Sequence, residues 1–196
     1  TFDDGYLEHY RVAKQLYRAD IPATFFVITG LKTYNGRRLL SAEPRLIRDI
    51  VDMGHEVGSH SHTHRDLTKL TPDEIDFECR TSKELLEGVI GRDIVGFAYP
   101  YGSFNSTTSS IVSKYYRYAR TMGPYNRWNK DANIYAVGSI GVRHLPKLLL
   151  GVKPRLLVVA FHTDLHLVKP TILFLNLFNA RFATLSEALK SVGLLS

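Results

Sequence analysis

Two clusters in this sequence have the residue types and spacing of a metal-dependent active site. The denser one is HSHTH, in which His60 and His64 lie four residues apart with His62 between them. On a helical turn or a tight loop this spacing brings two imidazoles together, and zinc and similar divalent ions favour such nitrogen ligands. The other is TFDDG, in which Asp3 and Asp4 are adjacent. A catalytic metal ion takes three protein ligands and leaves one position for water, so a carboxylate is the natural third ligand.

The adjacent carboxylates can take different roles if both reach one pocket. Neighbouring side chains on a strand face opposite ways, but Gly5 follows directly and allows the backbone to bend. One aspartate could then bind the metal while the other stays free as a base, because a divalent cation offsets their repulsion. The alternatives are an ordinary Asp-Gly turn and an exposed histidine-rich loop.

Two further segments could contribute to such a site. His162 follows the apolar run LLVVAF and is a candidate general acid, since the pKa of a histidine is about 6.5. His162 and His166 are also four residues apart and could instead form a metal-binding pair, or His162 could be structural. The segment YPYGSFN, residues 99–105, could stack on a sugar or offer backbone N–H groups to an oxyanion, or could simply be a rigid loop.

Apolar runs alternate with amphipathic stretches along the chain, and this pattern predicts the elements that position these residues. We expect helices at 6–19, 46–53, 71–87 and 106–115, the third opened by a capping box at Thr71–Glu74, and a C-terminal helix capped by Ser186. We expect strands at 1–3, 23–28, 56–60, 94–99, 118–121, 136–142 and 156–161. Such alternation is typical of a parallel α/β fold, and every polar cluster directly follows a strand, where such folds build their sites. A barrel-like sheet fits better than an open one, because no Gly-rich phosphate loop follows the first strand.

The composition is that of an ordinary globular domain. The 196 residues are 44% hydrophobic and 22% charged, and we expect a single domain over 1–196. No apolar run is long enough to form a transmembrane segment, and the single Cys79 excludes an internal disulfide. The net charge of +6 could suit an anionic polymer, but the scattered Lys and Arg residues do not predict nucleic-acid binding. The first residue is not Met and no signal peptide is visible, so we expect a processed or trimmed chain; the oligomeric state cannot be read from the sequence.

In this order, the motifs resemble the polysaccharide deacetylase family, the NodB-type chitooligosaccharide and peptidoglycan deacetylases of carbohydrate esterase family four. TFDDG resembles its first motif, His60-Ser61 with His64 its second, FAYPYG its third, and the strand before His162 its fifth. The stretches DIPATFFV, GHEVGSH and TLSEAL agree as well, so the resemblance covers nearly the whole chain.

The resemblance implies a distorted (β/α) barrel, usually seven-stranded, and the hydrolysis of N-acetyl groups on amino-sugar polymers. It implies that Asp4, His60 and His64 hold one divalent metal ion, with zinc expected and cobalt, nickel or manganese as alternatives. It further implies that Asp3 is the catalytic base and His162 the acid. The Tyr101 backbone N–H would stabilise the oxyanion, and Tyr99, Pro100 and Tyr101 would line the substrate site. The expected partner is an N-acetylated glycan, and the family favours a cell-surface or extracellular location.

The chain departs from the family pattern at three motifs: the third, the fourth, and the fifth, where Thr163 and then Asp164 follow His162 although the commonest pattern has Asp directly after the His. Ala98 stands where many members have an arginine that steadies the base, and the acidic-aromatic fourth motif is represented at best by NRWNKDAN, residues 126–133. What holds Asp3 is therefore open at this point. Two other functions also stay open: hydrolysis of another amide, such as a cyclic imide or ureide, and a catalytically silent carbohydrate-binding domain.

Overall fold

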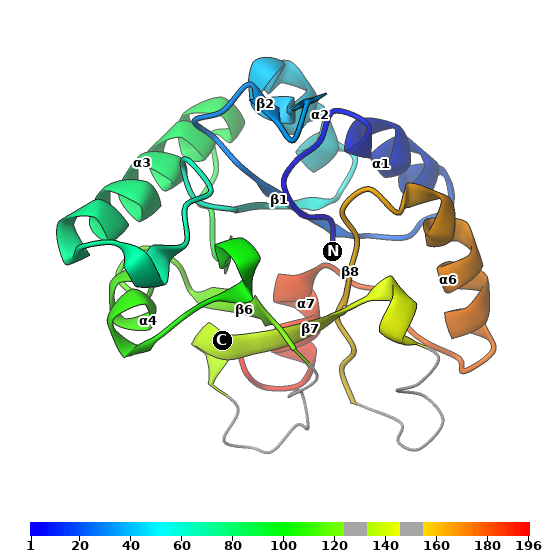
Figure 1. The fold of residues 1–196 in the computed structure, drawn as a ribbon. Helices are drawn as coiled ribbons and strands as arrows, with labels where there is room; N and C mark the ends of the chain where they lie inside the picture. Colours follow the sequence, from blue (N-terminus) through cyan, green and yellow to red (C-terminus); the bar gives the residue numbers. More distant parts are fainter. Residues whose placement is uncertain (124–132, 146–154) are drawn as a thin grey trace.

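The computed structural model describes residues 1–123, 133–145 and 155–196, and its centre is a curled parallel sheet (Figure 1). Neighbouring strands follow the order β1-β4-β5-β6-β7-β8. Their bounds are β1 Thr24–Val27, β4 Glu56–Ser59, β5 Gly96–Ala98, β6 Tyr118–Met122, β7 Val137–Gly141 and β8 Val159–Ala160. The expected α/β architecture with a parallel sheet surrounded by helices is confirmed.

The start of the chain joins the two edges of this sheet. Phe2 forms parallel bridges with Phe25 in β1 and with Phe161, the residue after β8. Asp3 donates its backbone N–H to the Phe161 carbonyl at 2.9 Å, and Phe161 donates to the Thr1 carbonyl at 3.0 Å. Residues 1–3, which were expected to form a strand, thus lie between the two edges of a sheet of six regular strands and pair with both through isolated bridges.

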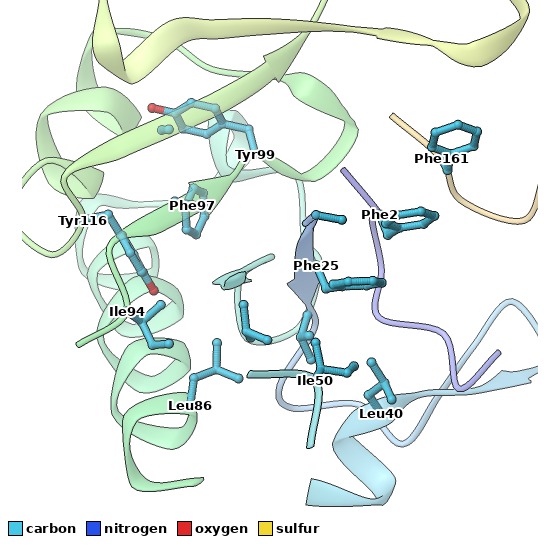
Figure 2. Packing of buried hydrophobic residues seen from close by; sticks show 14 of the residues in the cluster. Phe2, Phe25, Leu40, Ile50, Leu86, Ile94, Phe97, Tyr99, Tyr116 and Phe161 are labelled. Atoms are coloured by element: carbon cyan, nitrogen blue, oxygen red, sulfur yellow. The ribbon is translucent and has the colours of Figure 1, made fainter. Parts of the chain in front are cut away.

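Helices cover the outside of the sheet and bury the larger part of the core. They are α1 His9–Arg18, α2 Pro44–Asp52, α3 Pro72–Ile90, α4 Ser106–Val112 and α6 Val168–Asn176. Outward-facing strand residues such as Phe25 and Phe97 pack against Ile50 and Leu86 from these helices (Figure 2). The predicted Thr71–Glu74 capping box is present at the start of α3, which runs three residues past the predicted end and stops at Gly91 in the left-handed conformation.

A smaller cluster, Phe26, Ala98, Tyr118, Val137 and Val158, alternates along the strands with the outer layer and packs against Leu185 and Leu189 of the last helix, α7 Leu185–Ser191. The prediction that Ser186 caps this helix is wrong. Thr184 is the cap, because its hydroxyl accepts the Glu187 backbone N–H and the Glu187 carboxylate accepts the Thr184 N–H. No helix among the described residues has the length and apolar character needed to span a bilayer.

The sequence analysis missed α6 and a small antiparallel hairpin, β2 Thr33–Tyr34 and β3 Arg37–Arg38. The hairpin turn is Asn35-Gly36, with φ +48° and +73°. Asn-Gly is a strong signal for such two-residue turns, because both positions need positive φ. This signal was present in the sequence, and it matters because the hairpin carries Tyr34 to the edge of the site.

Candidate active site

Three of the predicted metal ligands meet at the carboxyl edge of the sheet. Asp4 Oδ1 lies 3.5 Å from His60 Nε2 and 3.4 Å from His64 Nε2, and the two Nε2 atoms are 3.2 Å apart. With metal–ligand bonds of about 2.0–2.1 Å, the edges of a ligand tetrahedron are about 3.3–3.4 Å long. The spacing and the two-nitrogen, one-oxygen donor set therefore fit one divalent ion. Among the described residues, no other group of three His, Cys, Asp or Glu side chains could hold a metal.

The protonation states of this trio suit a cation. His60 Nδ1 lies 2.8 Å from the Ala98 carbonyl, to which it donates, and this contact orients the ring so that Nε2 faces Asp4 and His64. Burial, together with the charge of His60, lowers the pKa of His64 to about 4. Burial would raise the pKa of Asp4, but the hydrogen bond and charge of His60 outweigh it and bring this pKa to about 2. Near neutral pH the site therefore presents a carboxylate and a neutral imidazole.

Backbone strain is concentrated at these residues. Asp4, Ser61, His64 and Tyr101 all have positive φ, between +59° and +69°, which is uncommon outside glycine. The expected bend at Gly5 thus begins one residue earlier, at Asp4. Gly5 itself has φ +70°, and a Cβ there would lie 3.1 Å from Val27. Non-glycine residues persist in this conformation where surrounding structure holds them, most often at functional sites.

The loop between the two histidines is held by the buried carboxylate of Glu78 on α3. Its Oε2 accepts the backbone N–H of His62 at 2.9 Å and of Thr63 at 2.7 Å, and its Oε1 accepts the Thr63 hydroxyl. The His64 N–H is bound by the Ser61 hydroxyl at 2.9 Å. His62 lies away from the trio, with Nδ1 3.1 Å from the Thr29 hydroxyl, as its place between the two ligands predicts.

Asp3, the expected base, is held by an arginine that the sequence analysis missed. Arg120 Nη2 donates to Asp3 Oδ2 at 2.6 Å, and both side chains are almost completely buried. Arg120 Nη1 in turn donates to the Ser139 hydroxyl at 2.7 Å. Arg120 is on β6, and its register partner on β5 is Ala98, the position of the missing third-motif arginine. Side chains of register partners share a face of the sheet, so a guanidinium is supplied from the neighbouring strand.

The ion pair also sets the charge of Asp3. Burial would raise the pKa of this carboxyl, but the Arg120 guanidinium and the nearby histidines outweigh it, so the pKa lies below its ordinary value of 3.8. Asp3 Oδ1 is buried and has no hydrogen-bond partner among the described residues. The result is a carboxylate with one oxygen fixed by Arg120 and the other buried without a partner among the described residues. A charged residue inside the apolar strand YARTM was the signal that could have located Arg120, because a buried charge needs a partner.

His162 reaches the same pocket from the end of β8. Its Nε2 lies 3.5 Å from Asp3 Oδ2, and 45% of its side chain is exposed. Neither His162 nor His166, the alternative metal-binding pair, belongs to a group of three potential metal ligands among the described residues, whereas Asp4, His60 and His64 form such a group. His166 lies in a single 3₁₀ turn, residues 165–167, and is exposed.

Of the three predicted substrate-lining residues, only Tyr101 is exposed. Tyr99 and Pro100 are buried, and the Tyr99 ring is covered by the ring of Phe104, which stacks on it at 5.3 Å and is itself exposed. Tyr101 is 61% exposed, and its ring centroid lies 4.8 Å from that of His64. Tyr34 from the hairpin packs on His64 at 4.7 Å, and its hydroxyl is 3.4 Å from that of Tyr101. The two tyrosines therefore border the metal trio on one side.

The fourth-motif candidate, residues 126–133, lies outside the described residues except for Asn133. Asn133 caps the 3₁₀ turn 134–136, with its side-chain oxygen accepting the Tyr135 N–H at 2.8 Å.

Comparison with known proteins agrees with this geometry. The family model described as polysaccharide deacetylase matches residues 1–119, which include the metal trio and Asp3. The chain belongs to the polysaccharide deacetylase family. It is 39% identical over 117 residues to a chitooligosaccharide deacetylase of Bradyrhizobium, covering 58% of this chain and 50% of that protein. It is 34% identical over 108 residues to the peptidoglycan-N-acetylmuramic acid deacetylase PdaA of Bacillus subtilis, covering 54% of this chain and 38% of that protein. The chain therefore spans about half or less of the length of these relatives.

Solved structures show the same fold. The Xyl-CE4 domain of a multidomain xylanase from the hindgut metagenome of Trinervitermes trinervoides superposes with a TM-score of 0.72 at 24% identity, covering 98% of this chain and 88% of that one. A CE4 family pseudoenzyme from Bacillus anthracis superposes with a TM-score of 0.70 at 20% identity, covering 93% of this chain and 61% of that one. The fold is thus shared by proteins described as enzymes and by a protein described as a pseudoenzyme, so activity depends on the residues of the site.

Proposed function

We propose that this polysaccharide deacetylase is a metal-dependent hydrolase that removes N-acetyl groups from an amino-sugar polymer or oligomer and releases acetate. The observation that carries the proposal is the arrangement around Asp3. One carboxylate oxygen is fixed by Arg120, the other is unpaired, and the pocket also contains the trio of Asp4, His60 and His64 and the ring of His162.

In this proposal Asp4, His60 and His64 hold a divalent ion. That ion would polarise the acetamide carbonyl and lower the pKa of a water molecule. Asp3 accepts the proton of the attacking water through its unpaired oxygen, while the Tyr101 backbone N–H donates to the developing oxyanion. His162 donates a proton to the departing sugar nitrogen. The products are acetate and a free amine.

Zinc is the ion that we expect, because a site of two imidazole nitrogens and one carboxylate oxygen is typical of catalytic zinc. Cobalt, nickel and manganese accept the same donors, so the residues alone favour zinc without demanding it. Metal analysis of the purified protein should give about one divalent ion per chain, and His60→Ala should remove it.

An N-acetylated glycan suits the exposure of the site. Tyr101 is 61% exposed and His162 is 45% exposed, so both can meet a substrate that extends beyond the reacting sugar. The named relatives act on chitooligosaccharides and peptidoglycan, which supports the same substrate class here. A small cyclic imide or ureide would instead require an enclosed pocket. The Arg120–Asp3 pair removes the main argument for a silent carbohydrate-binding domain, which was the missing arginine at Ala98.

The test is acetate release from chitooligosaccharides, acetylated peptidoglycan, poly-N-acetylglucosamine and small cyclic amides, with and without a chelator. The expected result is chelator-sensitive release from at least one glycan and none with His60→Ala. Release only from the cyclic amides would assign the alternative hydrolase activity. Binding of the glycans without any release would assign the silent domain.

A further inference from the structure

A buried histidine that belongs neither to the metal trio nor to the proposed proton-transfer residues contacts the segment that carries His162. His9 begins α1, and its Nε2 lies 2.7 Å from the backbone carbonyl oxygen of His162. Its side chain is fully buried, and its Nδ1 has no hydrogen-bond partner among the described residues. A carbonyl oxygen can only accept, so Nε2 carries the proton in this contact.

The position of the His9 ring is fixed from several sides. Its centroid lies 5.6 Å from the ring of Phe2, 5.6 Å from that of Tyr6 and 6.4 Å from that of Phe25. Phe2 and Tyr6 flank the Asp3-Asp4 pair in sequence, so His9 is anchored to the segment that carries the base. Burial lowers the pKa of His9, which keeps the ring neutral with a single N–H.

His162, by contrast, has few restraints of its own. Its side chain is 45% exposed, and among the described residues its ring has one polar contact, the 3.5 Å approach of Nε2 to Asp3 Oδ2. The regular pairing of β8 ends at Ala160, and Phe161 forms one further bridge, to Phe2 in the N-terminal segment. The Asp3 N–H fixes the peptide before His162 through the Phe161 carbonyl, and the hydrogen bond from His9 to the His162 carbonyl fixes the peptide after it, beyond the end of the sheet.

We propose that His9 is a positioning residue for the general acid: its Nε2–H holds the His162 peptide so that the His162 ring lies over the scissile C–N bond. This rests on the proposed function, in which the C–N bond of the tetrahedral adduct breaks, its electron pair goes to nitrogen, and the His162 imidazolium supplies the proton. His9 touches no reacting atom. Its contribution is the placement of the proton donor, and misplacement by about 1 Å can cost about 100-fold in rate.

Two acetylated substrates separate this role from a purely structural one. An N-acetyl amide, as in a chitooligosaccharide, needs protonation of its amine leaving group, whereas 4-nitrophenyl acetate expels a stable phenolate without an acid. His9→Phe keeps the aromatic packing and removes the donor. We expect kcat on the amide to fall about 10- to 100-fold, with KM and metal content unchanged and ester hydrolysis within about twofold of the parent protein.

The chain offers a matched control. His55 is also buried, its Nε2 lies 2.9 Å from the Ala13 carbonyl, its Nδ1 is unpaired, and burial likewise lowers its pKa. His55→Phe therefore removes the same kind of hydrogen bond away from the pocket, and it should lower stability without changing the amide-to-ester ratio. His9→Gln places an amide N–H donor near the position of Nε2 and should recover most of the amide activity that His9→Phe loses.

The outcomes distinguish failure of this inference from failure of the proposed function. A parent protein inactive on both substrates would overturn both. An active parent whose His9→Phe variant loses amide and ester hydrolysis equally, or loses neither, overturns the positioning role alone. If His9→Phe does not fold, His9→Met provides the donor-free variant. In a His162→Asn background, replacing His9 should have no further effect on the amide, and an additional loss there would also contradict the inference.

Discussion

Asp3 and His162, the residues proposed to transfer protons, lie 3.5 Å apart but are restrained in opposite ways. Asp3 is buried and lies in the N-terminal segment, residues 1–3, which pairs with both edges of the sheet. It also makes a buried ion pair with Arg120. His162 is half exposed and lies past the end of its strand, and the peptide that follows it is held by one neutral hydrogen bond from His9. The proposed base is thus part of the paired sheet, whereas the proposed acid lies at its edge.

This difference predicts how substitutions around each residue affect stability and rate. A buried ion pair that loses one partner leaves an uncompensated charge, which is strongly destabilising, whereas a neutral hydrogen bond at a partly exposed site contributes less. Substitutions on the base side should therefore affect folding, charge state and rate together. Substitutions on the acid side should affect mainly the rate.

The largest effect is expected for Asp3→Asn. The amide cannot accept a proton from water, so acetate release should fall about 10³-fold, within the range known for general bases. The metal trio does not include Asp3, so metal content should stay near one ion per chain, in contrast to His60→Ala. Measurement of acetate release alongside metal analysis checks both, and residual deacetylation close to that of the parent would show that Asp3 is not the base.

Arg120→Met should lower the rate about 100-fold and destabilise the fold by about 3 kcal/mol, because Asp3 is left charged and buried without its guanidinium. Denaturant unfolding measures this loss of stability. The double variant Asp3→Asn/Arg120→Met should be more stable than Arg120→Met alone, since the unpaired charge is gone. Ala98→Arg combined with Arg120→Ala places a guanidinium on the register partner and should recover part of the rate; no recovery would mean that only β6 can present the arginine correctly.

Arg120→Met should also shift the pH dependence. In the parent the pKa of Asp3 lies below 3.8, so the ion pair stabilises the fold above that pH and the stabilisation is lost as acid protonates Asp3. Without Arg120 the effect of burial is no longer outweighed, and the pKa of Asp3 rises. The acid limb of kcat/KM should therefore move to higher pH in the variant. An unchanged limb would show that another group controls it.

The sequence predicted most of the fold and much of the site because the relevant signals are local. Alternating apolar and amphipathic stretches gave the parallel α/β fold, the capping box gave the start of α3, and the motifs named the three ligands that the structure brings together. Asn35-Gly36 was an equally local signal for the hairpin that carries Tyr34, and it was overlooked.

Arg120 and His9 could not be found in the same way, because their partners are distant in sequence. Arg120 is 117 positions from Asp3, and His9 is 153 positions from the carbonyl that it binds. The third motif itself has only Ala98 at the position where many family members have an arginine. The arginine becomes visible once the register of β5 and β6 places Ala98 opposite Arg120.

Glu78 on α3 holds the loop between His60 and His64, and its substitution should change the affinity for the metal ion rather than the rate of the metal-loaded protein. Glu78→Met removes the acceptor for the His62 and Thr63 N–H groups, so we expect affinity for zinc to fall about 10- to 100-fold, as for other residues that orient ligands. Glu78→Gln is the matched control, because its amide oxygen can accept both N–H groups and its amide nitrogen can donate to the Thr63 hydroxyl. Competition with a chromogenic chelator measures the zinc affinity of both variants. An equal loss of affinity in the two would show that the charge of Glu78 matters rather than its hydrogen bonds.

The smallest effect is expected for Tyr101→Gly, at the exposed rim. Glycine accepts the positive φ of this residue and keeps the backbone N–H, so only the aromatic side chain is lost. Stacking of a sugar on this ring is worth about 1 kcal/mol, which corresponds to a rise in KM of about fivefold with kcat unchanged. Steady-state kinetics on chitooligosaccharides of increasing length provide the measurement. A fall in kcat at constant KM would instead place the ring against the reacting atoms, and the rim of the site would then be as tightly coupled to catalysis as the buried base.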